Sequence, residues 1–136
     1  LCCTGAQGDE VHSWLLTPPG LRDVAPATDA ADAREIRQRR LRGGGSDEVV
    51  AEHPRQKKYP LAVVIHGGPQ GAVLDSWSYR WNPQILCGAG FVVLCVNFHA
   101  STGYGAKFRE SVSKDWAGVA YDDIIAATEY ACSKLP

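Results

Sequence analysis

The stretch Leu61-Ala62-Val63-Val64-Ile65-His66-Gly67-Gly68-Pro69 decides the fold class of this chain. Its first five residues form a continuous apolar run that ends at a glycine pair, a pattern typical of a strand buried on both faces. A second such run, Phe91-Val92-Val93-Leu94-Cys95-Val96, follows it. Residues 81–88 between the runs have helical length, and Gly88 and Gly90 can end such a helix. Strand, helix and strand at this spacing predict a βαβ unit with parallel strands and a right-handed crossover.

Two further elements flank this unit. Residues 11–17 read as a strand that is closed by Pro18-Pro19-Gly20. Residues 122–132 predict a helix, and the pair Asp122-Asp123 falls in its first turn, where the helix dipole favours negative charge.

Composition limits the classes of protein to which the chain can belong. It has 136 residues, 45% of them apolar, which is enough for one globular domain. With 14 basic and 15 acidic residues the net charge is −1, which argues against a dedicated nucleic-acid binder or a protein held to membranes by charge. There is no apolar run of about 20 residues, and the first residues lack the basic start and the apolar stretch of a secretory signal. Because the sequence has no methionine, even at position 1, we expect a piece of a longer protein.

The five cysteines show no metal-binding pattern. No Cys-x-x-Cys pair occurs, so the spacing predicts no zinc site, and no organic cofactor is implied. Cys87, Cys95 and Cys132 lie among apolar neighbours and are expected to pack as small hydrophobic residues. The adjacent Cys2 and Cys3 are expected to be ordinary thiols, with a redox pair as the alternative. This usage favours a reducing compartment, and we expect a cytoplasmic location.

A charged segment separates the first strand from the others. Residues 29–58 hold eight of the 14 basic and six of the 15 acidic residues, and no aromatic residue occurs between Trp14 and Tyr59. Such a segment buries too little apolar surface to offset its ordering entropy. We therefore expect a disordered insert at 21–58. The alternative is a short basic helix within residues 32–42 that binds an acidic partner.

The glycine pair after the first buried run indicates a chemical role. In α/β-hydrolases the loop after this strand supplies one backbone donor of the oxyanion hole, and His-Gly-Gly is a familiar form of that loop. A backbone N–H suits the task because the fold fixes it before negative charge develops on the carbonyl oxygen. We assign this role to Gly68, and we expect the following Pro69 to restrict Gly68 to extended conformations and so to fix the direction of its N–H. His66 is expected to be structural and to form a hydrogen bond within its own loop.

Several motifs, in order, resemble the catalytic domain of the prolyl oligopeptidase family of serine peptidases. Within that family, the acylaminoacyl-peptidase and fungal dipeptidyl-peptidase branch is most similar. The Ser101-Thr102-Gly103-Tyr104-Gly105 element is the most specific, and the match covers nearly the whole chain outside residues 21–58. The other matching stretches are 5–14, Tyr59-Pro60, 66–71, Trp77, Trp81-Asn82-Pro83-Gln84, 90–93, 97–100 and Trp116-Ala117-Gly118.

The chain departs from the family pattern at several points. Ala100 and Ala117 replace glycines, which is tolerable only where φ is negative. No Gly-x-Ser-x-Gly motif occurs in the sequence, and in this fold the serine, aspartate and histidine follow one another downstream. The nucleophile, the Asp and the His of the triad are therefore expected outside this chain, as is the N-terminal β-propeller that members usually carry.

The resemblance implies an incomplete α/β-hydrolase domain over residues 1–136, with a mostly parallel sheet and helices on both faces. It also implies a serine-type peptidase that hydrolyses short peptides through an acyl-enzyme, inactive as this chain alone. Asn97 and Tyr104 follow the second strand, where open α/β sheets bind ligands, and are candidates for substrate binding. The alternatives are a carboxylesterase or lipase of the same fold, and a non-catalytic remnant or interaction module.

Other candidate motifs carry less weight. Ser101 and the remaining serines lack the flanking glycines of a nucleophile elbow. Gly103-Tyr104-Gly105 lacks the lysine of a phosphate-binding loop. Trp77, Tyr79 and Trp81 are expected to pack in the core or a pocket, with a nucleic-acid stacking platform as the less favoured interpretation.

Overall fold

The computed structural model describes residues 1–21 and 58–135. The expected insert at 21–58 lies outside the described residues except for its end residues, Leu21 and Lys58, and the alternative helix within 32–42 lies outside them entirely. In chain order the elements are β1 (Cys2–Thr4), the 3₁₀ turn η1 (Ala6–Gly8), β2 (Glu10–Leu16), β3 (Leu61–Val64), α2 (Pro83–Gly88), β4 (Val92–Asn97), α3 (Ala106–Glu110) and α4 (Val119–Lys134).

The four strands form one mixed sheet in the order β1-β2-β4-β3. β3 and β4 are parallel, with Leu61 opposite Val92, as the βαβ pattern predicts. β2 is antiparallel to both β1 and β4. The expectation of a mostly parallel sheet is therefore wrong for the described residues. β1 and β2 are joined by the short η1 turn, and so short a connection can join only antiparallel neighbours.

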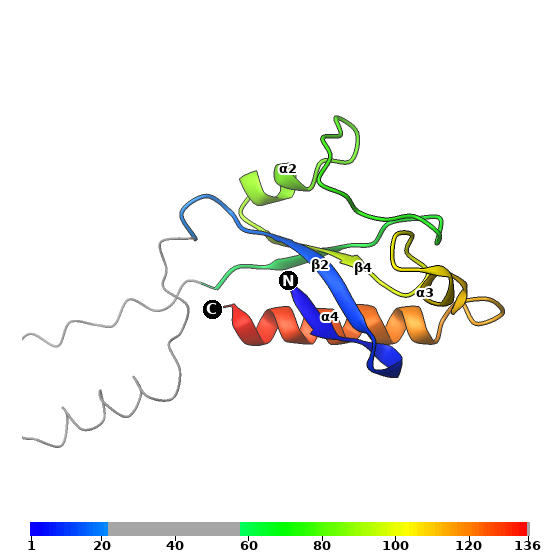
Figure 1. Ribbon diagram of the computed structural model, residues 1–136. Coiled ribbons are helices and arrows are strands. Elements are labelled where there is room, and N and C mark those ends of the chain that lie inside the picture. The colour runs from blue at the N-terminus through cyan, green and yellow to red at the C-terminus, as the bar shows by residue number, and fades with distance from the viewer. Residues whose placement is uncertain (22–57, 136) are drawn as a thin grey trace, which may run out of the picture.

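Helices cover both faces of this sheet. α2 lies above the sheet and α4 below it (Figure 1). Along β4 the side chains alternate, so that Leu94 and Val96 join the cluster that contains the α4 alanines, while Val93 and Cys95 pack with Cys87 of α2. Every residue of β4 is buried, as the apolar run predicts.

β3 corrects one expectation about burial. All four of its residues are only half-buried, although the sequence predicts a strand covered on both faces. Within the described part of the chain β3 pairs only with β4, so it is an edge strand. An apolar run in the sequence indicates that a strand is suited to burial on both faces. How much of it is buried depends on which other elements cover it.

The helix between the parallel strands begins and ends at residues suited to those positions. Asn82 caps it, since its Oδ1 accepts a hydrogen bond of 3.0 Å from the Gln84 N–H, and Pro83 occupies the first turn. α2 ends at Gly88, and Gly90 follows with φ +95°. The predicted helix over 81–88 is confirmed with a start two residues later.

The C-terminal helix packs against β4 through small residues. α4 buries Ala120, Ala127 and Ala131, whose spacing places them on one face. Asp122 lies in the first turn, as predicted. Its neighbour Asp123 is not a surface residue near the helix dipole, since it faces the sheet and is completely buried.

Two predictions about side-chain packing have different outcomes. Cys87 and Cys95 are buried as expected, whereas Cys132 is exposed near the end of α4.

None of the helices in residues 1–21 and 58–135 is long and apolar enough to cross a membrane.

Candidate functional site

The loops that follow β3 and β4 lie side by side because parallel strands bring their carboxyl ends to the same edge of the sheet. The Thr102 N–H donates a hydrogen bond of 2.8 Å to the Gly71 carbonyl and joins the two loops directly. Gly68 is in the first loop, Tyr104 is in the second, and Asn97 is the last residue of β4. The structure therefore brings the three predicted site residues to one edge.

Gly68 has a backbone conformation that favours glycine. Its φ is +136°, and a Cβ built on it would lie 2.8 Å from the Gln70 backbone nitrogen. The sequence predicts an ordinary extended conformation here because Pro69 follows, which is wrong. A proline restricts its predecessor partly through the predecessor's Cβ, which glycine lacks. The Gly68–Pro69 peptide bond is cis.

The Gly68 N–H takes no part in the hydrogen bonds of the described residues. Gly68 is exposed, and within the described residues its N–H has no acceptor. A donor that is fixed by the backbone and unpaired can bind a carbonyl oxygen or a developing oxyanion.

Two side-chain contacts fix His66 at the start of this loop. His66 Nε2 lies 2.9 Å from Ser101 Oγ, and the imidazole stacks on Phe98 with ring centroids 4.5 Å apart. His66 Nδ1 also lies 3.2 Å from the Gly67 carbonyl oxygen, the contact within its own loop that the sequence predicts. The link to Ser101 crosses to the neighbouring loop and was not predicted.

Ser101 Oγ and His66 Nε2 lie 2.9 Å apart, the distance of a serine nucleophile from its histidine base. The burial and the hydrogen bonds of Ser101 give the pair a different role. Ser101 is completely buried, and its hydroxyl donates a hydrogen bond of 2.6 Å to the Phe98 carbonyl. Toward His66 the hydroxyl can therefore act only as an acceptor, from an Nε2–H. The Nδ1 contact with the Gly67 carbonyl is a hydrogen bond at the same time only when both ring nitrogens carry a proton. A serine with its proton donated elsewhere and no exposed surface cannot attack a substrate, so this pair holds the two loops together.

Asn97 anchors the far end of the first loop. Its Oδ1 accepts a 2.7 Å hydrogen bond from the Val73 N–H, and its Nδ2 donates 3.1 Å bonds to the Val73 carbonyl and the Tyr104 hydroxyl. The amide is 4% exposed and uses its donors and acceptor inside the protein. Asn97 and Tyr104 line a cavity of about 340 Å³ together with Cys2, His12 and Trp14.

The loop after β4 turns through a series of unusual backbone conformations. Gly103 and Gly105 have φ of +98° and +92°, and Ala100 has φ +100°. The sequence allows an alanine at position 100 only with negative φ, so the structure contradicts that condition. Ala117, the other replacement of a family glycine, is not among the described residues with positive φ.

A buried charged cluster, which the sequence did not predict, lies on the α4 side of this edge. One oxygen of Asp123 lies 2.6 Å from both the backbone nitrogen and Nδ1 of His99, and the other accepts a 2.7 Å bond from Ala6 N–H. His99 Nε2 lies 3.2 Å from Asp9, which also pairs with Lys107 at 3.7 Å. We call Asp9, His99 and Asp123 the buried acid–histidine cluster after its two buried members, His99 and Asp123, since the Asp9 side chain is 40% exposed. It ties together η1, the end of β4 and α4.

The spacing of α4 contains the signal for this cluster. Asp123 precedes Ala127 by four residues and Ala131 by eight, so it lies on the helix face that carries the buried alanines. An aspartate on such a face needs hydrogen-bond partners inside the protein. Only the tertiary fold shows that His99 and the Ala6 N–H are those partners.

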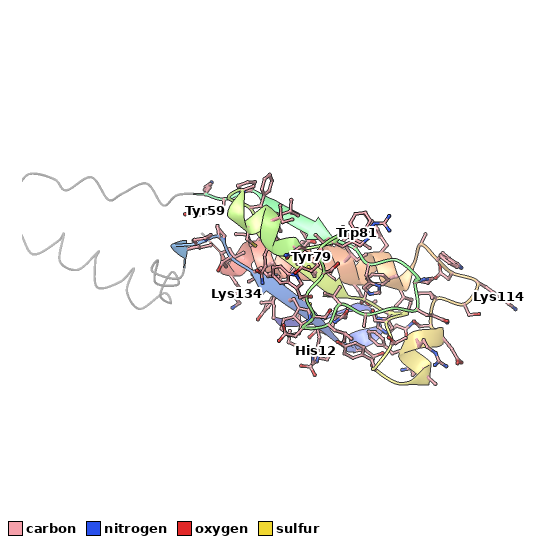
Figure 2. The ribbon with its side chains drawn as sticks, turned by 90° about the horizontal axis from the view of Figure 1, so that it is seen from above. His12, Tyr59, Tyr79, Trp81, Lys114 and Lys134 are labelled. Carbon is pink, nitrogen blue, oxygen red and sulfur yellow. The ribbon has the colours of Figure 1, made fainter. Side chains whose placement is uncertain are left out.

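The aromatic residues of the loop before α2 are exposed. Trp77, Tyr79 and Trp81 have 63%, 90% and 75% of their surfaces accessible, so the expectation of core packing is wrong, whereas the expectation of a pocket holds for Trp77, which lines a cavity of about 210 Å³. Figure 2 looks onto this side of the molecule, with Tyr79 and Trp81 labelled. The rings of Trp77 and Tyr79 contact each other edge to face, and the Arg80 guanidinium lies 5.1 Å from the Trp81 ring.

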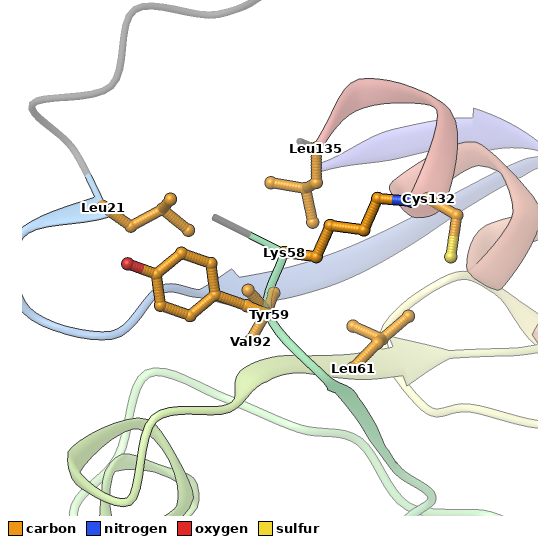
Figure 3. Close-up of a pocket in the computed structure, with 7 residues that line it drawn as sticks. All are labelled: Leu21, Lys58, Tyr59, Leu61, Val92, Cys132 and Leu135. Carbon is orange, nitrogen blue, oxygen red and sulfur yellow. The ribbon is translucent and has the colours of Figure 1, made fainter. Parts of the chain in front are cut away.

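A separate cavity lies at the amino ends of β3 and β4. It has a volume of about 440 Å³ and is open beside the two ends of the insert (Figure 3). Its lining is mostly apolar: Leu21, Lys58, Tyr59, Leu61, Val92, Cys132 and Leu135. It lies at the end of the strands away from the loops described above and contains none of the predicted site residues.

Comparison with known proteins identifies related sequences. Residues 77–135 match the family model described as the prolyl oligopeptidase family. The chain is 53% identical over 81 residues to dipeptidyl-peptidase 5 of Schizosaccharomyces pombe, covering 60% of this chain and 12% of that protein. It is 48% identical over 82 residues to a probable dipeptidyl-peptidase 5 of Aspergillus clavatus, covering 60% and 11%. The chain thus spans about an eighth of the length of these relatives.

Solved structures support the fold over nearly the whole chain. A Pyrococcus horikoshii acylaminoacyl peptidase matches 98% of this chain and 16% of its own, with a TM-score of 0.65 and 18% identity. A Mycobacterium tuberculosis puromycin-hydrolyzing peptidase matches 96% and 15%, with a TM-score of 0.62 and 24% identity. The mixed sheet and its helices thus correspond to part of an α/β-hydrolase domain.

Proposed function

We propose that this chain, whose residues 77–135 match the prolyl oligopeptidase family, forms the oxyanion-loop part of a serine-peptidase domain. In this proposal the Gly68 N–H donates a hydrogen bond to the carbonyl oxygen of the scissile bond. The substrate is a short peptide, a class supported by the names of the dipeptidyl-peptidase relatives.

One observation carries the proposal. Gly68 is exposed, its N–H lacks an acceptor within the described residues, and its φ is +136° in a loop that is held on both sides of the glycine. His66 with Ser101 fixes the loop before the glycine, and Asn97 with Val73 fixes it after the glycine. A donor held in place before the reaction needs no reorganisation when the carbonyl oxygen becomes negative, and this is the main advantage of an oxyanion hole.

The chemistry follows the acyl-enzyme route. A serine attacks the peptide carbonyl, and the tetrahedral intermediate places its oxyanion against the Gly68 N–H and a second donor. The sequence contains no Gly-x-Ser-x-Gly motif, so we infer that the serine, its histidine and its aspartate come from polypeptide beyond these 136 residues. The chain by itself is then inactive as a peptidase.

Asn97 and Tyr104 have different parts in this proposal. The Asn97 amide is fully engaged by Val73 and Tyr104, which supports a role in positioning the loop. The Tyr104 hydroxyl accepts from Asn97 and keeps its own proton to donate. Tyr104 is therefore the better candidate for direct contact with the substrate.

Ester hydrolysis would use the same oxyanion donor, so a carboxylesterase is the alternative within this fold. The similarity to dipeptidyl-peptidases favours peptides over esters. The interaction-module alternative depends on the basic residues of 34–42, which lie outside the described residues.

Two neighbouring glycines provide a matched test. A hybrid enzyme is made in which residues 59–135 replace the structurally corresponding segment of the Schizosaccharomyces pombe dipeptidyl-peptidase 5, which supplies the nucleophile. Gly68→Ala places a Cβ 2.8 Å from Gln70 N, whereas Gly67→Ala meets nothing within 4 Å. We expect Gly68→Ala to lower kcat on a chromogenic dipeptide by about 10²–10³-fold with little change in KM, because the bond forms mainly in the transition state.

The Gly67→Ala hybrid should retain kcat within a few-fold. Melting temperatures of both variants separate a displaced donor from a misfolded domain. A folded Gly68→Ala hybrid with near-full kcat would exclude Gly68 as the oxyanion donor.

A further inference from the structure

Three metal-binding side chains meet on the sheet near the start of the chain. Cys2 of β1 lies opposite His12 of β2 in the antiparallel ladder. The preceding pair, Leu1 and Ser13, exchanges both backbone hydrogen bonds, at 2.9 and 2.8 Å. Cys2 and His12 are therefore a non-hydrogen-bonded pair, the type in which facing side chains lie closest.

The third side chain, that of Glu10, lies on the same face as His12 because side chains alternate between the two faces of a strand. Glu10 precedes His12 by two residues, so both point to the same face of β2, while Val11 between them is buried on the other face. The Glu10 and His12 side chains are 72% and 53% exposed. An ion in solution can therefore reach this group, and Figure 2 shows His12 on the face seen from above.

The distances suit one ion. Cys2 Sγ lies 2.6 Å from Glu10 Oε1, and His12 Nε2 lies 3.8 Å from Glu10 Oε2. One donor atom from each of the three residues can be chosen so that all lie within 4.8 Å of one another. Bonds of about 2.0–2.3 Å to a tetrahedral zinc ion place its ligands roughly 3.3–3.8 Å apart. Small side-chain rotations would bring the three atoms to that spacing.

We propose that Cys2, Glu10 and His12 form a binding site for a divalent ion of the zinc type. A thiolate, an imidazole and a carboxylate are the ligands that zinc takes in proteins, and the thiolate disfavours magnesium and calcium. With three protein ligands, the fourth position is open to water or another small ligand. Cys2 and His12 also line the cavity that holds Asn97 and Tyr104, so there is room for such a ligand.

Binding exchanges a proton for the metal. In the metal-free protein the Cys2 thiol donates its hydrogen bond to Glu10, and this bond raises the pKa of Cys2 to about 11. The ion takes the place of the thiol proton, forms a sulfur–metal bond and leaves Glu10 free to turn its carboxylate to the metal. One proton per ion is released to solvent.

Cobalt titration of the 136-residue chain tests this site, because a thiolate bound to Co²⁺ gives a charge-transfer absorption in the near ultraviolet. We expect that band to saturate at one Co²⁺ per chain under reducing conditions and to be displaced by Zn²⁺. Cys2→Ser should abolish the band. His12→Ala and Glu10→Gln should each weaken binding by about tenfold or more.

Cys3→Ser is the matched control, because Cys3 is the neighbouring thiol and packs toward the α4 face. It should keep both the band and the affinity, and circular dichroism verifies that each variant is folded. The proposal is overturned if the unmodified chain gives no thiolate band, or if the band survives in Cys2→Ser. It is also overturned if His12→Ala and Glu10→Gln bind Co²⁺ as tightly as the unmodified chain.

Discussion

The two faces of β4 differ in the polar groups that lie beside them and in how exposed their surroundings are. On the α4 face, Asp123 and His99 are charged or chargeable groups with 0% and 1% of their surfaces exposed. On the α2 face, the polar group at the end of β4 is the neutral amide of Asn97. The loop between β3 and α2 lies on this face, and its Trp77 and Tyr79 are 63% and 90% exposed.

This difference indicates that the α4 face stabilises the fold, whereas the α2 face holds the loop that exposes the Gly68 N–H. The buried acid–histidine cluster joins three segments that are far apart in the sequence, so the α4 face is a closed piece of structure. The loop on the α2 face is held by the His66–Ser101, Thr102–Gly71 and Asn97–Val73 contacts, which leave the Gly68 N–H exposed. We therefore expect substitutions on the first face to affect folding, and substitutions on the second to affect the geometry of the loop.

The largest effect is expected from Asp123→Ala. The substitution leaves His99 and two backbone N–H groups without their buried acceptor. Breaking a buried charged pair in this way costs about 3–5 kcal/mol of unfolding free energy. Urea denaturation measures it, with Asp122→Ala as the matched control, because Asp122 is exposed on the same helix and its loss should cost less than about 1 kcal/mol. Equal losses from the two variants would contradict the role assigned to the cluster.

Asn97→Ala should have an intermediate effect. The Val73 N–H loses its acceptor, whereas the Val73 carbonyl keeps its 2.9 Å hydrogen bond from Trp14 Nε1. A buried unsatisfied group costs about 1–3 kcal/mol, and because Val73 is half-buried we expect the lower end of that range. Because the contact anchors one loop, we expect hydrogen exchange at the Val73 amide to accelerate more than exchange at amides of β4. Unchanged protection of Val73 would show that the loop does not depend on this side chain.

The smallest effect, with the opposite sign, is expected from Ala100→Gly. Ala100 is buried at φ +100°, where an L residue carries a strain of about 1–2 kcal/mol. Glycine removes the strain but loses about 0.5–1 kcal/mol through its freer unfolded state. We expect the melting temperature to rise slightly, whereas Ala117→Gly, a control without positive φ, should lower it. A clear loss of stability in Ala100→Gly would contradict the observed backbone conformation.

Local sequence patterns predicted the elements whose neighbours lie close in the chain. The run 91–96 became β4, the helix predicted over 81–88 is α2, and the helix predicted over 122–132 lies within α4. The edge that gathers Gly68, Asn97 and Tyr104 follows from the parallel order of two strands, which the βαβ spacing already implies.

Long-range pairing produced what the sequence did not show. β3 is half-buried because, within the described residues, it pairs with a strand on one edge only. β2 runs antiparallel to β1 because a turn of three residues joins them. Asp123 and His99 are 24 residues apart, so no local rule joins them. The proposed metal site depends on the register of β1 with β2, which a search for closely spaced cysteines does not detect. The expected insert at 21–58 and the cytoplasmic location stay predictions.

The central claim is that this chain presents an oxyanion donor without a nucleophile of its own, although His66 and Ser101 lie 2.9 Å apart. A fluorophosphonate probe tests it most directly, because the probe labels only an activated serine. Incubated with the purified 136-residue chain, it should leave the protein mass unchanged while labelling a complete serine peptidase in the same tube. Stoichiometric labelling of the chain, mapped to Ser101, would contradict the account and make the pair a catalytic dyad.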